Sequence, residues 1–231
     1  IAYDEIAEGM SSIKSRISDH NIIVHRIFWA EKKEIEQDEY TIHSDGTIAK
    51  IDTKKLNESV ENFALVDMVI DQLGLNLLNI KTNLITSKAL PQSPDEIVVI
   101  IPEIVNSAEQ YFELDSHITL VNSSTGKITH KHSESSKTNG WVSDAVNLTA
   151  ITIDTAPYLV AKDQRAFGVR VQYYGSSRVN PYINKTISLF VKSGDALKKV
   201  LHNYEVMNYG GEWDGDCEGE FTEEKKILII S

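Results

Sequence analysis

After Pro94 the helical spacing of apolar residues disappears, and this loss constrains the fold more than any other feature of the chain. Short apolar or alternating runs follow at near-regular intervals, separated by turns rich in Gly, Asn and Ser. These runs are residues 96–101, 111–114, 117–121, 127–132, 146–153, 167–174, 186–191, 197–205 and 226–230. Such spacing is typical of an antiparallel sandwich or barrel. Residues 95–231 are therefore predicted to form an antiparallel all-β sandwich or barrel-like domain, with almost no helix longer than two turns.

Residues 1–92 show a different pattern and are predicted to form a small α+β domain of helix, three strands and helix, so the predicted fold class is α+β. Apolar residues spaced four, three and four apart indicate an amphipathic helix over residues 3–18. β-Branched and aromatic residues predict a strand over residues 21–29. Asp45 and Gly46 then separate two alternating segments, which indicates a β-hairpin.

The end of this first domain carries helix and linker signals. Asn57 is the expected N-cap of a second helix, and Gly74 stands where a left-handed C-cap belongs. Residues 75–85 fit either a strand or a helix. Two prolines without periodicity in residues 89–94 indicate a linker between the domains.

The densest set of carboxylates lies near the C-terminus. It matches the first, third, fifth, sixth and ninth positions of a calcium loop with Asp214, Asp216, Glu218, Gly219 and Thr222. Lys225 occupies the twelfth position, which requires a bidentate Glu, and residues 226–230 predict a strand where a helix should follow. Two interpretations stay open: a calcium loop between strands, and a solvated acidic turn. No cofactor is required, and calcium is the candidate ion.

A polar loop rich in aromatic residues is the candidate partner-binding surface. It contains Tyr173, Tyr174, Arg178, Asn180 and Tyr182. Tyr and Arg supply large contact areas and directed hydrogen bonds in protein interfaces. An ordinary solvent-exposed loop is the alternative interpretation.

Two further clusters have competing interpretations. His130 and His132 alternate on one expected strand, and with His117 on its neighbour they suggest either a transition-metal site or an exposed polar face. Residues 139–144 are expected to form a turn over a packed Trp141. Cys217 lies between two acidic residues, which disfavour a reactive thiolate.

The formal net charge of −11 restricts the class of partner. An acidic chain is a poor ligand for nucleic acid or anionic membranes, and it favours a basic protein. No apolar run approaches the ~20 residues of a membrane span, so none is predicted.

Four segments carry a resemblance to known proteins: residues 153–158, 165–170, 187–190 and 210–214. They resemble exported, β-rich bacterial envelope proteins, some of which are similar to periplasmic lysozyme inhibitors or to immunity proteins. Such inhibitors place a Ser-Gly loop and a nearby Tyr in the enzyme cleft, whereas here Ser193 and Gly194 are followed by Asp195. The resemblance implies a periplasmic or exported location.

Together these features predict a non-catalytic binding or inhibitory protein, of the immunity type, that recognises a basic lysozyme-like enzyme or toxin. No catalytic residue is assigned. One alternative is a metal-dependent hydrolase that uses Asp214, Asp216 and Glu218 as ligands. A second alternative is a structural module of the envelope.

Overall fold

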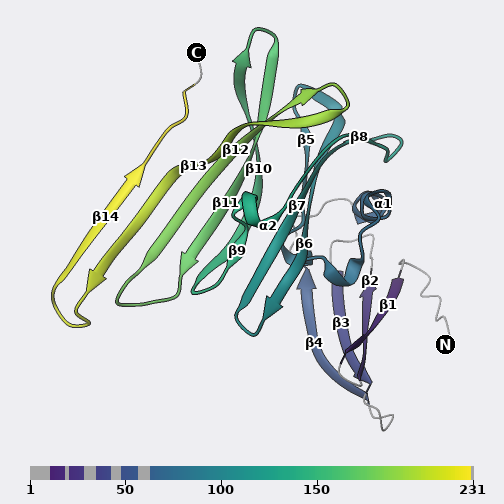
Figure 1. Cartoon of the computed structure of the whole chain (residues 1–231), viewed down its shortest axis with the longest axis horizontal. Coiled ribbons are helices and arrows are strands. Elements are labelled where there is room, and N and C mark those ends of the chain that lie inside the picture. The colour runs from purple at the N-terminus through teal and green to yellow at the C-terminus, as the bar shows by residue number, and fades with distance from the viewer. Residues whose placement is uncertain (1–10, 19–20, 29–34, 43–47, 57–62, 230–231) are drawn as a thin grey trace.

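The computed structural model describes residues 11–18, 21–28, 35–42, 48–56 and 63–229. In these ranges the chain is mostly β-strand and forms two sheets (Figure 1). The first sheet has four antiparallel strands in chain order: β1 (Ser11–Ser18), β2 (Asn21–Phe28), β3 (Ile35–Ile42) and β4 (Ile48–Leu56). β2 confirms the strand predicted over residues 21–29. The β3–β4 pairing confirms the predicted hairpin, whose Asp45 and Gly46 lie outside the described residues.

The helix predicted over residues 3–18 is wrong for residues 11–18, which form strand β1 and pair with β2 along their whole length. Ile13 and Ile17 are four residues apart. Residues with that spacing share one face of a helix and also one face of a strand, so the pattern did not distinguish a helix from a strand. Residues 3–10 lie outside the described ranges.

The second predicted helix is present as α1 (Phe63–Leu73), and Gly74 follows it with φ +68°. This left-handed residue confirms the predicted C-cap, while the expected N-cap Asn57 lies outside the described residues. The ambiguous residues 75–85 contain two 3₁₀ turns, η1 (Leu77–Asn79) and η2 (Thr82–Leu84). They lead the chain into the second sheet.

The second sheet has ten strands, eight of which follow the order β10-β11-β12-β13-β8-β7-β6-β5. β14 pairs with β13, and β9 pairs with β7. The strands are β5 (Thr86–Leu90), β6 (Ser93–Ala108), β7 (Tyr111–Asn122), β8 (Ile128–Glu134), β9 (Val142–Ser143), β10 (Val146–Ala161), β11 (Gln164–Gly175), β12 (Tyr182–Ser193), β13 (Ala196–Trp213) and β14 (Gly219–Lys225). All pairings are antiparallel except β13 with β8. The prediction of a mainly antiparallel, barrel-like sheet is confirmed.

The linker predicted over residues 89–94 is instead the turn of the β5–β6 hairpin, in which Ala89 pairs with Ile97 and Leu90 with Ser93. Prolines fit here because a tight turn needs no ladder hydrogen bond from their nitrogens. The two predicted domains therefore meet inside one sheet.

The sheet curls until its two ends lie side by side, as a nearly closed barrel (Figure 1). Lys88 Nζ of β5 donates to Ile153 O of β10 over 3.3 Å, across the gap between the ends. The junction between β5 and β10 is one of two seams, places where neighbouring strands share few or no backbone pairs. The second seam lies between β8 and β13, which share a single pair, Ala196 with Lys131. The interior is filled by apolar side chains from both halves of the sheet: Val98, Ile100, Leu114, Leu120, Ile153, Phe167, Val169 and Phe190.

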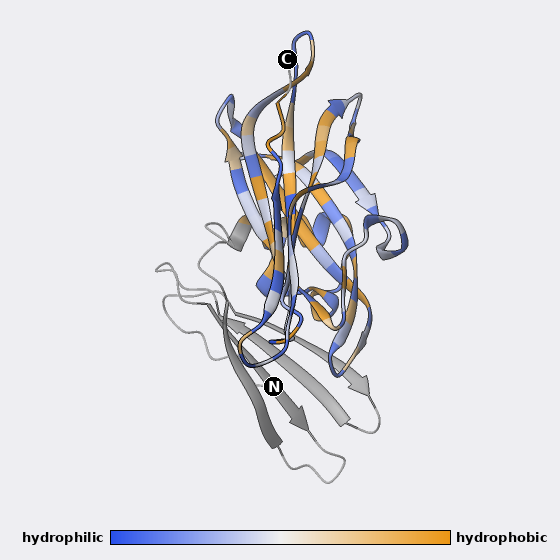
Figure 2. Ribbon diagram, turned by 90° about the vertical axis from the view of Figure 1, so that its left-hand side faces the viewer, coloured by the Kyte–Doolittle hydropathy of each residue, from blue (hydrophilic) through white to orange (hydrophobic). Residues whose placement is uncertain are grey.

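The centre of β6 is buried on both faces, which explains its unbroken apolar run. Val98 and Ile100 face the barrel interior, whereas Val99 and Ile101 pack outward beneath α1. Much of the remaining sheet alternates hydrophilic and hydrophobic residues along its strands (Figure 2), although residues 187–191 of β12 are also buried without a break. Continuous burial of this kind occurs only where both faces of a strand are covered.

The C-terminal half departs from the prediction at its end. β14 stops at Lys225, so the strand predicted over residues 226–230 is wrong for residues 226–229. Between residues 96 and 229 the only α-helix is the four-residue α2 (Ser136–Asn139), which confirms the expected lack of long helices. No helix in the described ranges is long and apolar enough to cross a lipid bilayer.

Candidate functional site

The acidic loop connects β13 to β14, and its first carboxylate shapes the turn. Asp214 Oδ1 accepts hydrogen bonds from the backbone N–H groups of Asp216 (2.8 Å) and Glu218 (3.1 Å). These bonds lower the pKa of Asp214 below its ordinary value, since they favour the charged form. Gly215, with φ +90°, supplies the backbone conformation that the turn requires.

This hairpin and the loop before β12 enclose a pocket of about 1090 Å³, called here the acidic pocket. Its lining includes the acidic residues Glu212, Asp214, Glu218 and Glu220, together with Val179, Asn180, Gly210, Gly211, Trp213, Cys217, Gly219 and Thr222. The backbone N–H of Trp213 donates to Val179 O over 2.7 Å and joins the two walls. The pocket brings four sequence-predicted residues together: Asn180, Asp214, Glu218 and Thr222.

The lining of the acidic pocket holds four carboxylates and no Lys, Arg or His. The nearby lysines have other partners: Lys225 pairs with Glu223, and Lys226 pairs with Glu205 and Glu224. The four carboxylates are thus left without a cation from the described residues. The pocket is a strongly negative surface.

Aromatic side chains flank this surface. The rings of Tyr209 and Phe221 stack with centroids 6.3 Å apart. Phe221 is 50% exposed and Trp213 is 37% exposed, so neither aromatic side chain is buried beneath the loop. In the register of the hairpin, Trp213 lies on the same face as Tyr209 and Phe221, whereas the paired Glu212 and Glu220 lie on the opposite face.

The metal interpretation gains no support from the arrangement of acidic residues. Asp216, a predicted ligand, does not line the pocket, and one oxygen of Asp214 is already engaged by the backbone. Among the described residues, no group of three or more His, Cys, Asp or Glu side chains is placed to hold a metal ion. The calcium loop stays a prediction.

The predicted histidine cluster is wrong. His117 pairs with Ser133, whereas His132 pairs with Ile118 and His130 with Leu120, so His117 points to the opposite face of the sheet. His117 Nε2 lies 3.0 Å from Glu103 Oε2. The exposed-face alternative fails too for His132, which packs edge-on against Phe190 with ring centroids 5.3 Å apart.

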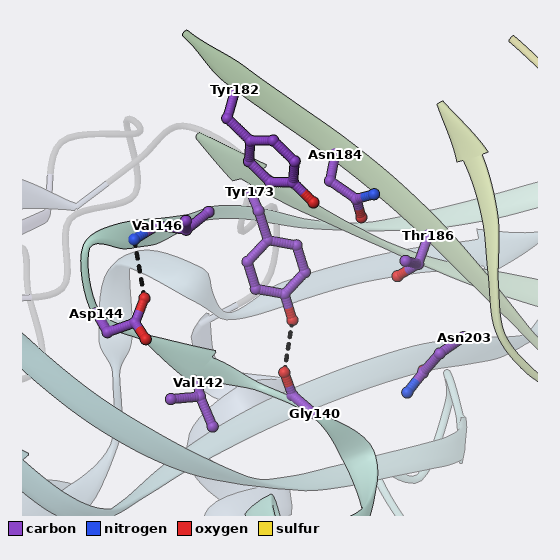
Figure 3. A pocket seen from close by; sticks show the side chains of 9 residues that line it. All are labelled: Gly140, Val142, Asp144, Val146, Tyr173, Tyr182, Asn184, Thr186 and Asn203. Carbon is purple, nitrogen blue, oxygen red and sulfur yellow. Dashed lines mark hydrogen bonds between the residues drawn. The ribbon is translucent and has the colours of Figure 1, made fainter. Parts of the chain in front are cut away.

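A second pocket, of about 470 Å³, is called here the tyrosine pocket (Figure 3). It is lined by Gly140, Val142, Asp144, Val146, Tyr173, Tyr182, Asn184, Thr186 and Asn203. Tyr173 and Tyr182 belong to the predicted partner-binding surface. Tyr174 and Arg178, from the same prediction, are exposed and line neither of these two pockets, because Tyr174 alternates to the opposite face from Tyr173.

The segment around α2 forms the floor of the tyrosine pocket, and Asn139 fixes it in place. Asn139 Nδ2 donates to Leu114 O (2.9 Å) and Glu134 O (3.3 Å), and its Oδ1 accepts from the backbone N–H of Trp141 (2.7 Å). Trp141 is 4% exposed, which confirms the predicted turn over a packed tryptophan. Gly140 ends α2 with φ +74°.

The opposite wall comes from β11, β12 and β13. Tyr173 Oη donates to Gly140 O over 2.8 Å and so ties this wall to the floor. Burial, followed by the neighbouring Tyr182, raises the pKa of Tyr173. Asn203 Nδ2 donates to Asn139 O over 2.9 Å, from a position in β13 with φ +39°.

Sequence reasoning missed Asp144, Asn184, Thr186 and Asn203. One signal was available: Asn184, Thr186 and Ser188 occupy alternate positions of β12, ahead of the interior Phe190. A polar run on the inward face of a strand marks a place where the interior is not filled by apolar side chains.

The polar groups near these pockets do not form a nucleophilic site. Ser143 is 2% exposed, and its Oγ accepts from the backbone N–H of Leu148 over 3.2 Å. Cys217 is an exposed free thiol in an acidic surrounding. A charged cluster of Asp154 with Arg170 (2.7 Å) and Tyr158 (2.8 Å) lies outside both linings and joins adjacent strands.

No family model, curated protein or solved structure matches this chain. The two pockets and their chemistry therefore carry the functional argument.

Proposed function

We propose that the protein is a non-catalytic binding protein, of the inhibitory or immunity type, whose acidic pocket recognises a basic surface on a partner protein. One observation carries the proposal: four acidic residues line the pocket, and no basic residue is among the residues that line it. Such a lining complements Lys or Arg side chains. The predicted location in a bacterial envelope stays a prediction.

The physical basis is electrostatic complementarity. Charges of one sign gathered in a concave surface raise the local concentration of oppositely charged partners and speed their association. The net charge of −11 adds a long-range attraction of the same sign.

The test compares two triple variants of the full chain. Glu212→Gln, Glu218→Gln and Glu220→Gln remove three charges from the pocket. Each side chain keeps its size. The control, Glu109→Gln with Asp163→Asn and Asp195→Asn, removes three charges from exposed positions outside both pockets. Both sets therefore change the net charge equally.

The probe is a cationic lysozyme, and the measurement is its association rate at low and physiological salt. The wild type and the control should associate quickly at low salt and slow by about tenfold or more near 0.15 M, because exposed charges are then screened beyond ~8 Å. The pocket variant should associate slowly at both. Equal rates for the two triple variants would show that net charge alone attracts the probe, and would refute the pocket.

A further inference from the structure

The free polar atoms of the tyrosine pocket are mostly hydrogen-bond acceptors. The hydroxyl of Tyr173 donates its hydrogen bond to Gly140 O, so the Tyr173 oxygen can only accept hydrogen bonds from a ligand in the pocket (Figure 3). Asp144 Oδ1 accepts from the backbone N–H of Val146 over 2.8 Å, and Oδ2 takes no hydrogen bond from a described residue. These two oxygens can each receive a donor from a ligand.

The amide groups in the lining increase this imbalance. Asn184 is 8% exposed, and its nitrogen donates to Glu205 Oε2 over 2.8 Å, which leaves its oxygen for the pocket. Asn203 Nδ2 donates to Asn139 O, and its Oδ1 accepts from Ser188 Oγ over 2.9 Å. The donors that remain are the hydroxyls of Tyr182 and Thr186, which make no hydrogen bond with a described residue, and the second N–H of each amide. The acceptors that remain include the only charged group of the lining, so a ligand with donors and a positive charge fits this pocket best.

The charge of the lining also favours a cationic ligand. Asp144 is its one charged side chain, and it forms no ion pair with the residues the structure describes. The absence of Lys, Arg and His from this lining leaves phosphate or carboxylate ligands without a counter-charge. Two phenol rings add faces that attract cations.

We propose that the tyrosine pocket binds an alkylammonium group, supplied by a free diamine or by a lysine side chain. An ammonium carries three donors, no acceptor and a positive charge, which suits a lining whose free acceptors include oxygens of Asp144, Asn184 and Tyr173. The volume of about 470 Å³ lies in the ordinary range for small-ligand sites. This inference does not rest on the function proposed for the acidic pocket.

The test is an NMR titration of the ¹⁵N-labelled full chain with cadaverine, Nα-acetyl-lysine amide, and the neutral isostere pentane-1,5-diol. Cadaverine or the lysine amide should shift the backbone amides of Gly140 and Asn184, and the diol should not. Asp144→Asn keeps the Oδ1 acceptor and removes the charge, so it should weaken binding by about 10-fold or more. Asp195→Asn, at an exposed turn, is the matched control and should bind as the wild type does.

The relative affinity of the two amines identifies the source of the group, because a site for free diamines prefers cadaverine and a site for side chains accepts the lysine amide equally. Shifts confined to Gly211 and Gly219 would place the amine in the acidic pocket and overturn the proposal. Equal shifts with the diol would also overturn it, as would no shift at all. If Asp144→Asn does not fold, the wild-type titration with the amines and the diol tests the proposal by itself. The triple variant of the acidic pocket should retain cadaverine binding in the tyrosine pocket.

Discussion

Replacing Lys199 with methionine tests what holds the barrel at its weak seam between β8 and β13. A single backbone pair joins these strands, so side chains must supply most of the contact. Lys199 Nζ, on β13, donates to Glu134 Oε2, on β8, and the two side chains are only 6% and 16% exposed. Methionine keeps most of the apolar stem and removes the cation, which leaves the largely buried carboxylate of Glu134 with His132 Nε2, 3.4 Å away, as its remaining ion-pair partner.

The expected cost is about 3–5 kcal/mol at neutral pH, the range for breaking a buried pair, whereas an exposed pair contributes about 0–1 kcal/mol. Burial raises the pKa of Glu134, but the hydrogen bond and charge of Lys199, together with hydrogen bonds from His132 and Thr138, outweigh it, so the folded pKa lies below the ordinary value. A group with a depressed folded pKa stabilises fully above its unfolded pKa of ~4.3. That stabilisation is lost as the pH falls through the folded pKa.

Without Lys199 the two largest influences that lower the pKa of Glu134 are lost while burial still raises it, so this pKa should rise. The difference in free energy of unfolding between wild type and Lys199→Met should therefore shrink in acid, where Glu134 is protonated in both proteins. Urea unfolding followed at neutral pH and below pH ~4 measures this change. The double variant Glu134→Gln with Lys199→Met should be more stable than Lys199→Met alone. A loss below about 1 kcal/mol that is the same at both pH values would refute the reasoning.

Three further predictions concern other parts of the molecule. Asn139→Ala should cost about 2–3 kcal/mol in urea unfolding, because it leaves buried backbone groups without partners; a smaller loss than 1 kcal/mol would contradict this. Millimolar calcium should leave the melting temperature unchanged in wild type and Asp216→Asn alike, and a rise abolished by the substitution would restore the calcium loop. Ile101→Ala should cost about 2–5 kcal/mol in urea unfolding, while Val105→Ala, on the same strand but 47% exposed, should cost under about 0.5 kcal/mol.

Most strands were predictable because their signals are local. Ser193, Gly194 and Asp195 mark the β12–β13 turn, and Gly194 indeed has φ +59°. The helix prediction based on the spacing of Ile13 and Ile17 was wrong, because residues four apart share a face in a helix and also in a strand. The pairing of β8 with β13 could not be predicted, because it joins segments about 65 residues apart with one backbone pair and buried side chains.

The candidate sites were predictable only in part, for the same reason. The run of carboxylates at 212–220 is visible in the sequence, but Asn180 joins it only through the bond from Trp213 to Val179 O. Asp144 and Tyr173 are far apart in the chain, and the floor built by Asn139 brings them to one pocket. Contacts of this kind depend on tertiary packing, which periodicity does not report.

The order of strands in the barrel has a consequence for the route of folding. β5 to β8 are neighbours in chain order, and so are β10 to β13, so each half is a meander with short loops. Short loops cost little chain entropy to close, whereas the β8–β13 and β5–β10 contacts join distant segments. We expect the two meanders to assemble independently and the seams to form last. Substitutions at Lys199 should then speed unfolding and leave the rate of refolding almost unchanged.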